Sequence, residues 1–300
     1  MLNNMGEDKV VVSVIMPCYN QGKFVAEAID SVLAQTYPCW ELIVMNDGSS
    51  DHSERIILEY VQKDKRIKYF CQENAGVVVA RNQAIKHAQG KYLLPLDADD
   101  KISNDYLERG VTYLEGHPEC TLFYCHADYF GGVNEPFPVE YEGYPALLLV
   151  NKIFCTSLFR KEHFDLVGGY STDFMDGYED WEFFIRLLYH RDCVYQDEKT
   201  CFYYRRSERS RNDEANQKFL DLRKRVYMKH VTIYDEYWGD FFSVLQERDG
   251  LRDRLKNELR HEEETVKWME LQYQNAVHSK SYRLGYALLH PLEKLKNLFL

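Results

Sequence analysis

The sequence lacks the features that mark membrane-spanning and exported proteins. No stretch reaches the roughly 18 consecutive apolar residues that a spanning helix needs. The first apolar run, at residues 10–16, is short and follows a polar, acidic start, which does not fit a signal peptide. We therefore expect a cytoplasmic protein, with peripheral binding on the cytoplasmic face of the membrane as the alternative.

Basic charge and paired cysteines are scarce as well. The chain carries 37 lysines and arginines against 48 aspartates and glutamates, for a formal net charge of −11. Nucleic-acid binding without sequence preference depends on basic surface that neutralises phosphates, so we expect no nucleic-acid partner. The eight cysteines include no Cys-x-x-Cys pair, and several lie in apolar segments. This pattern indicates free thiols in a reducing compartment.

What the chain does contain is organised around residues 91–100, where an apolar run ends in carboxylates. The run Tyr92–Leu96 has the length of a buried strand, and Asp97 and Asp99 follow it directly. Carboxylates at this spacing repel one another unless a cation lies between them, which suggests a site for Mg²⁺ or Mn²⁺. An acidic turn before a helix near Asn104 would give the same pattern, and this segment alone does not separate the two.

Strand-like and helix-like segments alternate four times in the first hundred residues. We expect strands at 10–16, 40–45, 67–71 and 91–96, each followed by a helix. This alternation predicts an α/β fold, with a doubly wound, mostly parallel sheet flanked by helices and joined by right-handed crossovers. The ends of these strands should bring Tyr19, Asp47, Gly76 and Asp99 to one edge of the sheet, where ligands bind in such folds.

The composition divides the chain into three parts. Residues 1–8 are expected to be a flexible N-terminus, 9–212 the α/β domain, and 213–300 a helical extension. Apolar positions between Leu255 and Ala276 recur in steps of four and three, broken once at Glu262, which predicts a coiled coil and a homodimer through 251–277. The chain ends in an amphipathic segment whose apolar positions are Leu288, Leu289, Leu292, Leu295, Leu298 and Phe299.

Six motifs in a fixed order carry a family resemblance over roughly residues 10–210. They are Val12-Ser13-Val14-Ile15-Met16-Pro17-Cys18-Tyr19-Asn20, Ser31-Val32-Leu33-Ala34-Gln35-Thr36-Tyr37, Asn46-Asp47-Gly48-Ser49-Ser50-Asp51, Gly76 with Ala80-Arg81-Asn82, Asp97-Ala98-Asp99-Asp100, and Glu179-Asp180-Trp181. Together they resemble the family 2 inverting glycosyltransferases of bacterial cell-surface polysaccharide synthesis, which use nucleotide sugars and have a GT-A fold. Asn46 departs from the pattern, because the family more often has Asp there.

The resemblance implies a nucleotide site at the first two loops. Pro17, Tyr19 and Asn20 would lie at the nucleotide, with the Tyr19 ring stacked on the base and Asp47 accepting a hydrogen bond from an imide N–H. Two other interpretations stay open: Tyr19 as a half-buried aromatic beside the first strand, and Asp47 as a residue that stabilises its own turn.

The resemblance also assigns the groups around the diphosphate. Arg81 would face the two phosphates, with an ion pair at the surface as its alternative. Asp97 would contact the ribose, and Asp99 would hold the Mg²⁺ or Mn²⁺ that bridges the phosphates. An arginine of the segment 201–210 is expected to touch phosphate as well.

On the acceptor side the resemblance gives one catalytic residue and two neighbours. Asp180 would be the general base that takes the proton of the acceptor hydroxyl, with Glu179 as the fallback and helix capping as the structural alternative. Glu179 and Trp181 are expected to contact the acceptor, although Trp181 could equally pack in the core.

The expected activity is therefore metal-dependent, inverting transfer of a hexosyl or N-acetylhexosaminyl group. The donor by resemblance is a UDP-sugar, and the acceptor is a hydroxyl of a glycan or a lipid-linked glycan. Two other functions stay open: an inactive scaffold of a polysaccharide assembly complex, and a sugar nucleotidyltransferase. The second would carry a glycine-rich loop with Arg and Lys after the first strand, where this chain has Pro17-Cys18-Tyr19-Asn20.

Deleting residues 281–300 is expected to reduce liposome association and activity on a lipid-linked acceptor, while transfer to a soluble acceptor analogue stays largely intact. The apolar stripe suits the headgroup region of a membrane, but only Arg283, Lys294 and Lys296 flank it, so binding should be weak and reversible. Co-sedimentation with liposomes and both transfer assays measure this. A truncated chain that is insoluble or changes its oligomeric state, with no liposome binding by the full chain, would show that the stripe packs on protein.

Overall fold

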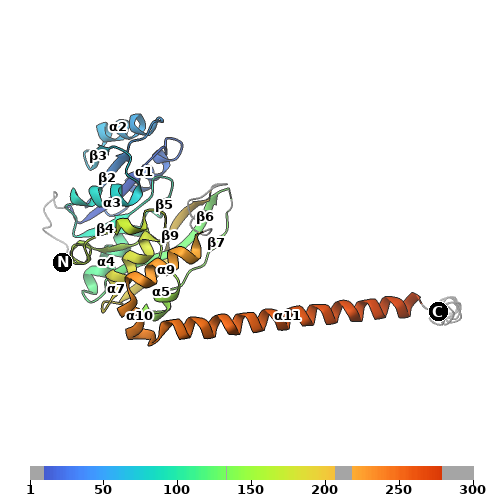
Figure 1. Cartoon of the computed structure of the whole chain (residues 1–300). Helices are drawn as coiled ribbons and strands as arrows, with labels where there is room; N and C mark the ends of the chain where they lie inside the picture. Colours follow the sequence, from blue (N-terminus) through green and yellow to red (C-terminus); the bar gives the residue numbers. More distant parts are fainter. Residues whose placement is uncertain (1–9, 133, 207–217, 279–300) are drawn as a thin grey trace, which may run out of the picture. The chain divides into compact units, whose positions relative to one another are not determined.

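The computed structural model of the chain describes residues 10–132, 134–206 and 218–278 (Figure 1). The expected flexible N-terminus and the apolar stripe at 288–299 lie outside these residues. The chain divides into two compact units between Val231 and Thr232. Sequence composition places the boundary near residue 213 instead, because the charged helix that follows looks like part of the extension.

The first unit opens with the strand and helix repeats that the sequence predicts. They are β1 (Val12–Cys18), α1 (Val25–Leu33), β2 (Trp40–Asp47), α2 (Ser53–Lys63), β3 (Ile67–Gln72), α3 (Val77–Lys86) and β4 (Tyr92–Pro95). Every residue of β1 and of β2 is buried. Continuous apolar sequences of this kind are typical of parallel strands that are covered on both faces.

The rest of this unit is less regular. It contains β5 (Lys101–Ile102), α4 (Tyr106–Gly116), β6 (Leu122–Gly131), β7 (Pro136–Phe137), α5 (Tyr144–Leu149), β8 (Leu158–Arg160), α6 (Lys161–Val167), the 3₁₀ turn η1 (Thr172–Phe174), α7 (Glu179–Leu188), β9 (Val194–Arg206) and α9 (Phe219–Lys229). Between β6 and α5 the described residues form only the short strand β7 and loops.

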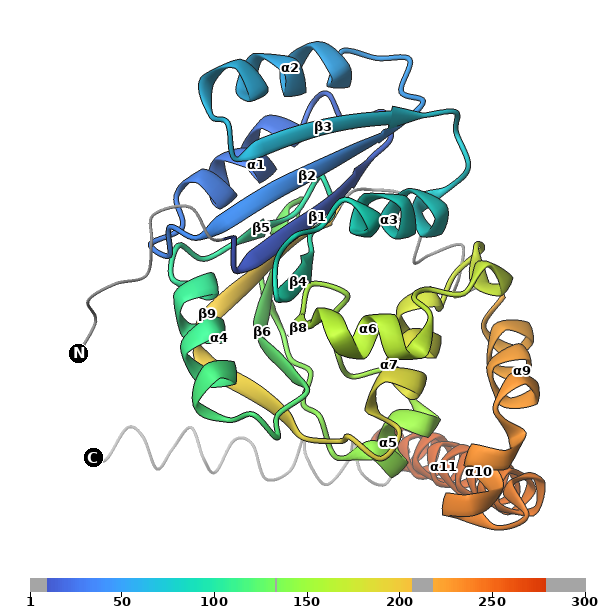
Figure 2. The ribbon, with the colours of Figure 1, turned by 90° about the vertical axis from the view of Figure 1, so that its left-hand side faces the viewer.

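The sheet is mixed, and its strand order sets the position of the site. The nine strands run β3-β2-β1-β4-β8-β6-β9-β5, with β7 paired to β6. Strands β1 to β4 are parallel, whereas β8 pairs antiparallel with both β4 and β6. Figure 2 shows α1 and α4 on one face and α3, α6 and α7 on the other. The strand order reverses between β1 and β4, which is where ligands bind in open α/β sheets.

The second unit consists of the helices α10 (Val231–Trp238) and α11 (Phe241–His278). Helix α11 is 38 residues long, and the apolar side chains of its four-three repeat are exposed, among them Leu255, Leu259, Val266 and Met269. Within the described residues, no helix combines the length and the apolar character needed to cross a membrane.

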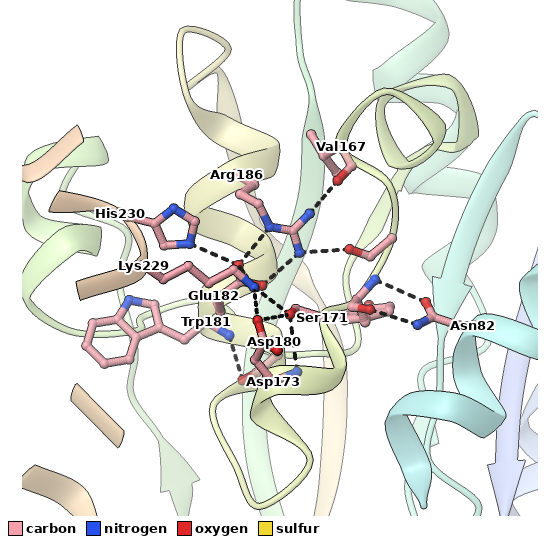
Figure 3. A network of polar contacts seen from close by, with 12 residues as sticks. Asn82, Val167, Ser171, Asp173, Asp180, Trp181, Glu182, Arg186, Lys229 and His230 are labelled. Carbon is pink, nitrogen blue, oxygen red and sulfur yellow. Dashed lines mark hydrogen bonds and ion pairs between the residues drawn. The ribbon is translucent and has the colours of Figure 1, made fainter. Parts of the chain in front are cut away.

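A buried carboxylate holds α7, the helix that begins with Glu179 and Asp180. Glu182 is fully buried, and its carboxylate accepts hydrogen bonds from Nε and Nη2 of Arg186 at 2.8 and 2.7 Å (Figure 3). His230 Nε2, just beyond α9, lies 2.9 Å from Glu182 Oε1, and Lys229 Nζ lies 3.4 Å away. These contacts attach α9 to the α/β unit, which explains why the boundary falls after it.

Cationic partners reverse the effect of burial on Glu182. Burial alone would raise the pKa of its carboxyl group, but the hydrogen bonds from His230 and Arg186 outweigh it and lower the pKa from 4.5 to about 2. Because the folded-state pKa lies below the unfolded value, ionised Glu182 stabilises the fold fully above about pH 4.5. This stabilisation is lost as the pH falls from about 4.5 toward 2.

Substitution of Glu182 by Gln is expected to lower the free energy of unfolding at pH 7 by about 3 kcal/mol, since a shift of one pKa unit corresponds to about 1.4 kcal/mol. Urea denaturation followed by circular dichroism measures the loss, which should shrink when the titration is repeated at pH 4 and pH 3. Glu162→Gln on α6 is the matched control, because that side chain is 71% exposed. A loss that is independent of pH would contradict an ionic origin.

Candidate active site

The loops after β1 and β2 are fixed to each other through Asn20. This residue has a left-handed backbone, with φ of 53°. Its N–H donates to Ser49 Oγ at 3.0 Å, and its side-chain Oδ1 accepts from Ser50 N at 2.8 Å. Pro17 is buried in β1, whereas the Tyr19 side chain is 50% exposed. Asn20 therefore shapes the loop that presents the Tyr19 ring.

Asp47, at the end of β2, holds the loop that leads into α3. Its carboxylate accepts from Gln72 Nε2 at 2.7 Å and from the backbone N–H groups of Ala75 and Gly76, both at 2.9 Å. Gly76 has φ of 87°, a conformation that favours glycine. These three bonds occupy three of the roughly four acceptor positions of a carboxylate.

The acidic segment after β4 is held from β9. Arg205 donates from its backbone N–H to Asp100 Oδ1 at 2.7 Å and from Nε to the Asp99 carbonyl at 2.8 Å. The same guanidinium forms an ion pair with Glu27 of α1, which also pairs with Lys101 at 2.6 Å. Arg205, one of the arginines in the segment expected to touch phosphate, thus has a structural task, which is to fix the Asp97–Asp100 turn.

The electrostatics of this turn favour a bound cation. Burial, and then the neighbouring Asp97 carboxylate, raise the pKa of Asp99 to about 6. Burial together with Asp99 and Asp97 also raises the pKa of Asp100. No group of three or more His, Cys, Asp or Glu side chains in the described part of the chain could hold a metal by itself. This donor set fits Mg²⁺ or Mn²⁺, because Mg²⁺ commonly binds one or two carboxylates together with substrate phosphates and water.

Arg81 lies inside the protein rather than on the expected diphosphate surface. Its side chain is 1% exposed, and its Nη2 lies 3.0 Å from Asp97 Oδ1 while its Nη1 lies 3.4 Å from Glu179 Oε1. The ion pair that sequence reasoning offered as the alternative exists, but it is buried. That alternative placed the ion pair at the surface, whereas the Arg81 side chain is enclosed and one of its partners, Glu179, comes from α7.

The three candidate residues in the first turn of α7 have different surroundings. Asn151 Nδ2 donates to Asp180 Oδ2 at 3.2 Å. Glu179 is buried against Arg81, and Trp181 is 4% exposed with its indole N–H bonded to the Leu147 carbonyl at 2.6 Å. Trp181 therefore joins α7 to α5, which agrees with the core packing that sequence analysis kept as its alternative. Glu179 likewise has a structural partner in Arg81.

The charges of acids from the turn after β4 and from the start of α7 both act on one thiol, that of Cys155. Burial raises the pKa of Cys155 well above its ordinary value. The carboxylates of Asp97, Asp180 and Glu179 raise it further, and Arg81 opposes them. The structure thus brings together residues that lie far apart in the sequence. Asn151 and Cys155 belong to this cluster, but no spacing rule could have identified them in the irregular segment before β8.

Comparison with known proteins identifies the family. The description "Glycosyl transferase family 2" belongs to a family model that matches residues 13–172. The "Putative teichuronic acid biosynthesis glycosyltransferase TuaG" of Bacillus subtilis is 41% identical over 107 residues, which cover 35% of this chain and 42% of that protein. The glycosyltransferase GlyA of Streptococcus pneumoniae is 42% identical over 102 residues, covering 34% of this chain and 14% of GlyA. The matched segment thus spans less than half the length of these relatives.

Solved structures agree on the fold. S. aureus TarS 1–349 in complex with UDP-GlcNAc aligns with a TM-score of 0.59 at 21% identity, over 68% of this chain and 61% of that one. The mannosyltransferase PcManGT from Pyrobaculum calidifontis, in complex with GDP-Man and Mn²⁺, aligns with a TM-score of 0.55 at 18% identity, over 97% and 87%. At these identities the likeness concerns the fold alone. Since the family match covers just over half of the chain, from β1 to the turn before α7, the chain belongs to glycosyl transferase family 2.

Proposed function

We propose that this chain is a metal-dependent inverting glycosyltransferase, which moves a hexosyl or N-acetylhexosaminyl group from a nucleotide sugar to an acceptor hydroxyl. The observation that carries the proposal is that Arg81 contacts both Asp97, two residues before Asp99, and Glu179, the neighbour of Asp180. One acid pair suits a metal and a diphosphate, and the other suits a proton transfer.

A UDP-sugar is the proposed donor, bound across the ends of β1, β2 and β4. The exposed Tyr19 ring can stack on the base, and Asp47 retains one acceptor position for an imide N–H. TarS has been crystallised with UDP and with UDP-GlcNAc, and PcManGT with GDP-Man. The nucleobase of the donor therefore has to be determined by experiment. Asp97 is the proposed contact of the ribose, and the 41% exposure of its side chain supports this role.

The proposed reaction is a single displacement. The acceptor oxygen forms a bond to the anomeric carbon as the bond to the diphosphate breaks, and the bonding electron pair leaves with the nucleoside diphosphate. Asp180 takes the hydroxyl proton, and Asn151 orients its carboxylate. A metal ion bound at Asp99 supplies Lewis-acid stabilisation of the leaving diphosphate. Attack from the face opposite the diphosphate inverts the anomeric configuration.

We further propose that the acceptor is a glycan or lipid-linked glycan of surface polysaccharide synthesis. The name of TuaG, which refers to teichuronic acid biosynthesis, supports this assignment. We also propose a cytoplasmic location, with peripheral membrane contact through the apolar stripe at 288–299. A homodimer through 251–277 would cover the exposed apolar repeat of α11. An inactive scaffold and a nucleotidyltransferase are the rival functions, and a transfer assay separates them.

Asp99→Asn is expected to abolish metal-dependent nucleotide binding without unfolding the α/β unit. The amide lacks the charge that holds a divalent cation in this acidic turn. Thermal shift with UDP and Mn²⁺ measures the effect, since a ligand at one hundred times its dissociation constant adds roughly 2.7 kcal/mol of stability. Asp165→Asn on α6 serves as control, because its side chain is 56% exposed. If the metal dependence were unchanged in Asp99→Asn, the Asp97–Asp100 segment would be a turn and not a metal site.

Asp180→Asn is expected to keep donor binding and to lose transfer by roughly 10²- to 10⁴-fold, the usual effect of removing a general base. Isothermal titration of UDP with Mn²⁺ measures binding, and release of UDP in the presence of acceptor measures transfer. NMR of the wild-type product should show the anomeric configuration opposite to that of the donor. Retained configuration contradicts single displacement, and unimpaired transfer by the variant removes Asp180 as the base.

A further inference from the structure

We propose that Arg81 is a positioning residue that fixes the acceptor-side base relative to the donor-side acids, through the buried link Asp97–Arg81–Glu179. This inference rests on the proposed function, because it takes Asp180 as the base. It also replaces the expectation that Arg81 binds the diphosphate. The link joins three elements, since Arg81 lies on α3, Asp97 follows β4 and Glu179 begins α7.

Burial argues against direct contact between Arg81 and the donor. With 1% of its side chain exposed, the guanidinium presents no surface to a phosphate. Its Nε is buried and finds no hydrogen-bond acceptor among the described residues, so the Nη groups make its polar contacts. To reach a phosphate, Arg81 would have to leave both carboxylates, and a carboxylate left buried without its partner is strongly destabilising.

The geometry of the link suits arginine and excludes lysine. The Nη2 and Nη1 groups reach Asp97 and Glu179 at 3.0 and 3.4 Å, respectively, from one planar group. The Tyr170 ring lies over the guanidinium, with Cζ 5.1 Å from the ring centroid. A lysine ammonium carries the same charge at a single point and lacks the rigid fork that spans two acids.

The next residue strengthens the attachment between α3 and the approach to α7. Asn82 Nδ2 donates to the Tyr170 carbonyl at 2.8 Å, and its Oδ1 accepts from the Tyr170 N–H at 3.0 Å. In Figure 3 the Asn82 contacts lie on one side of the network and the Glu182 contacts on the other. The chain then enters α7 through Tyr178, which has φ of 65°. Asp180 thus follows directly from Glu179, which Arg81 holds.

Through Glu179, Arg81 fixes the first turn of α7. On that turn Asn151 Nδ2 and the Trp181 N–H hold the Asp180 carboxylate. Asp97 belongs to the turn that carries Asp99, so the link spans from the proposed metal side to the proposed base. A displacement of about 1 Å at a reacting group can lower the rate on the order of 10²-fold. Loss of the link should therefore lower kcat and leave donor affinity nearly unchanged.

The test compares Arg81→Lys with the wild-type full-length chain, alone and in the Asp180→Asn background. UDP binding with Mn²⁺ is measured by isothermal titration, and kcat by UDP release from UDP-GlcNAc or whichever UDP-sugar in a panel is consumed fastest. We expect kcat to fall by roughly 10- to 100-fold, with the UDP dissociation constant changed by less than about threefold. In the Asp180→Asn background the same substitution should add little, since the base that it positions is already absent.

Arg160→Lys is the matched control. Arg160 is another buried arginine, but it donates to the backbone carbonyls of Leu114, His117 and Cys120 and to the Tyr92 hydroxyl. Its substitution should lower the melting temperature without changing kcat. Should Arg81→Lys do only the same, the residue serves packing and the inference fails.

Two further outcomes distinguish failure of the Arg81 inference from failure of the proposed function. Weaker UDP binding by Arg81→Lys at unchanged kcat, or an equal loss of kcat in both backgrounds, would make Arg81 a donor ligand and overturn the inference. Unimpaired transfer by Asp180→Asn alone would overturn the proposed base, whatever Arg81 does. A Glu179→Gln variant provides the last check, because its effect on kcat and that of Arg81→Lys should not be additive if both break one link.

Discussion

Repulsion between carboxylates is the constraint on which this structure depends. Asp97, Asp99 and Asp100 follow one strand, and Glu179 and Asp180 approach the same place from α7. Two arginines, Arg81 and Arg205, offset part of this charge from inside the fold. They do not offset all of it, since burial and then the Asp97 carboxylate still raise the pKa of Asp99 to about 6. A divalent cation bound at Asp99, as proposed, would offset part of the remaining charge.

The same constraint explains why residues that look like ligands have structural partners. Asn20 joins two loops, Asp47 holds a third, and Arg205 fixes the acidic turn. A loop must be rigid to present a ring or a carboxylate at a fixed place, and side chains of the same motif provide that rigidity. The motif residues of this chain therefore fall into two groups: those proposed to contact the substrate, and those that hold the first group in position. The sequence alone does not distinguish the two groups.

The sequence predicted the first half of the fold well and the second half poorly, for a physical reason. β1 to β4 are parallel, buried strands whose apolar runs identify them locally, and the order of the six motifs gives the family. The later strands pair in mixed directions, so their sequences carry no such signal. Burial of Arg81 could not be predicted, because its partner Glu179 lies 98 residues away. The packing of Trp181 could not be predicted either, since it depends on Leu147 of α5, a helix that the sequence analysis did not identify.

Helix α7 is held by contacts on two sides. Glu182 ties the helix to α9 and η1 through cationic partners, and Glu179 ties it to the donor side through Arg81. A helix held at two successive turns in different directions cannot slide or rotate without breaking a buried ion pair, which is strongly destabilising. The turn that carries the proposed base is therefore held by contacts within the protein. This separation leaves the segment between β6 and α5 free to vary with the acceptor, because changes there need not alter the distance between the proposed metal and the proposed base.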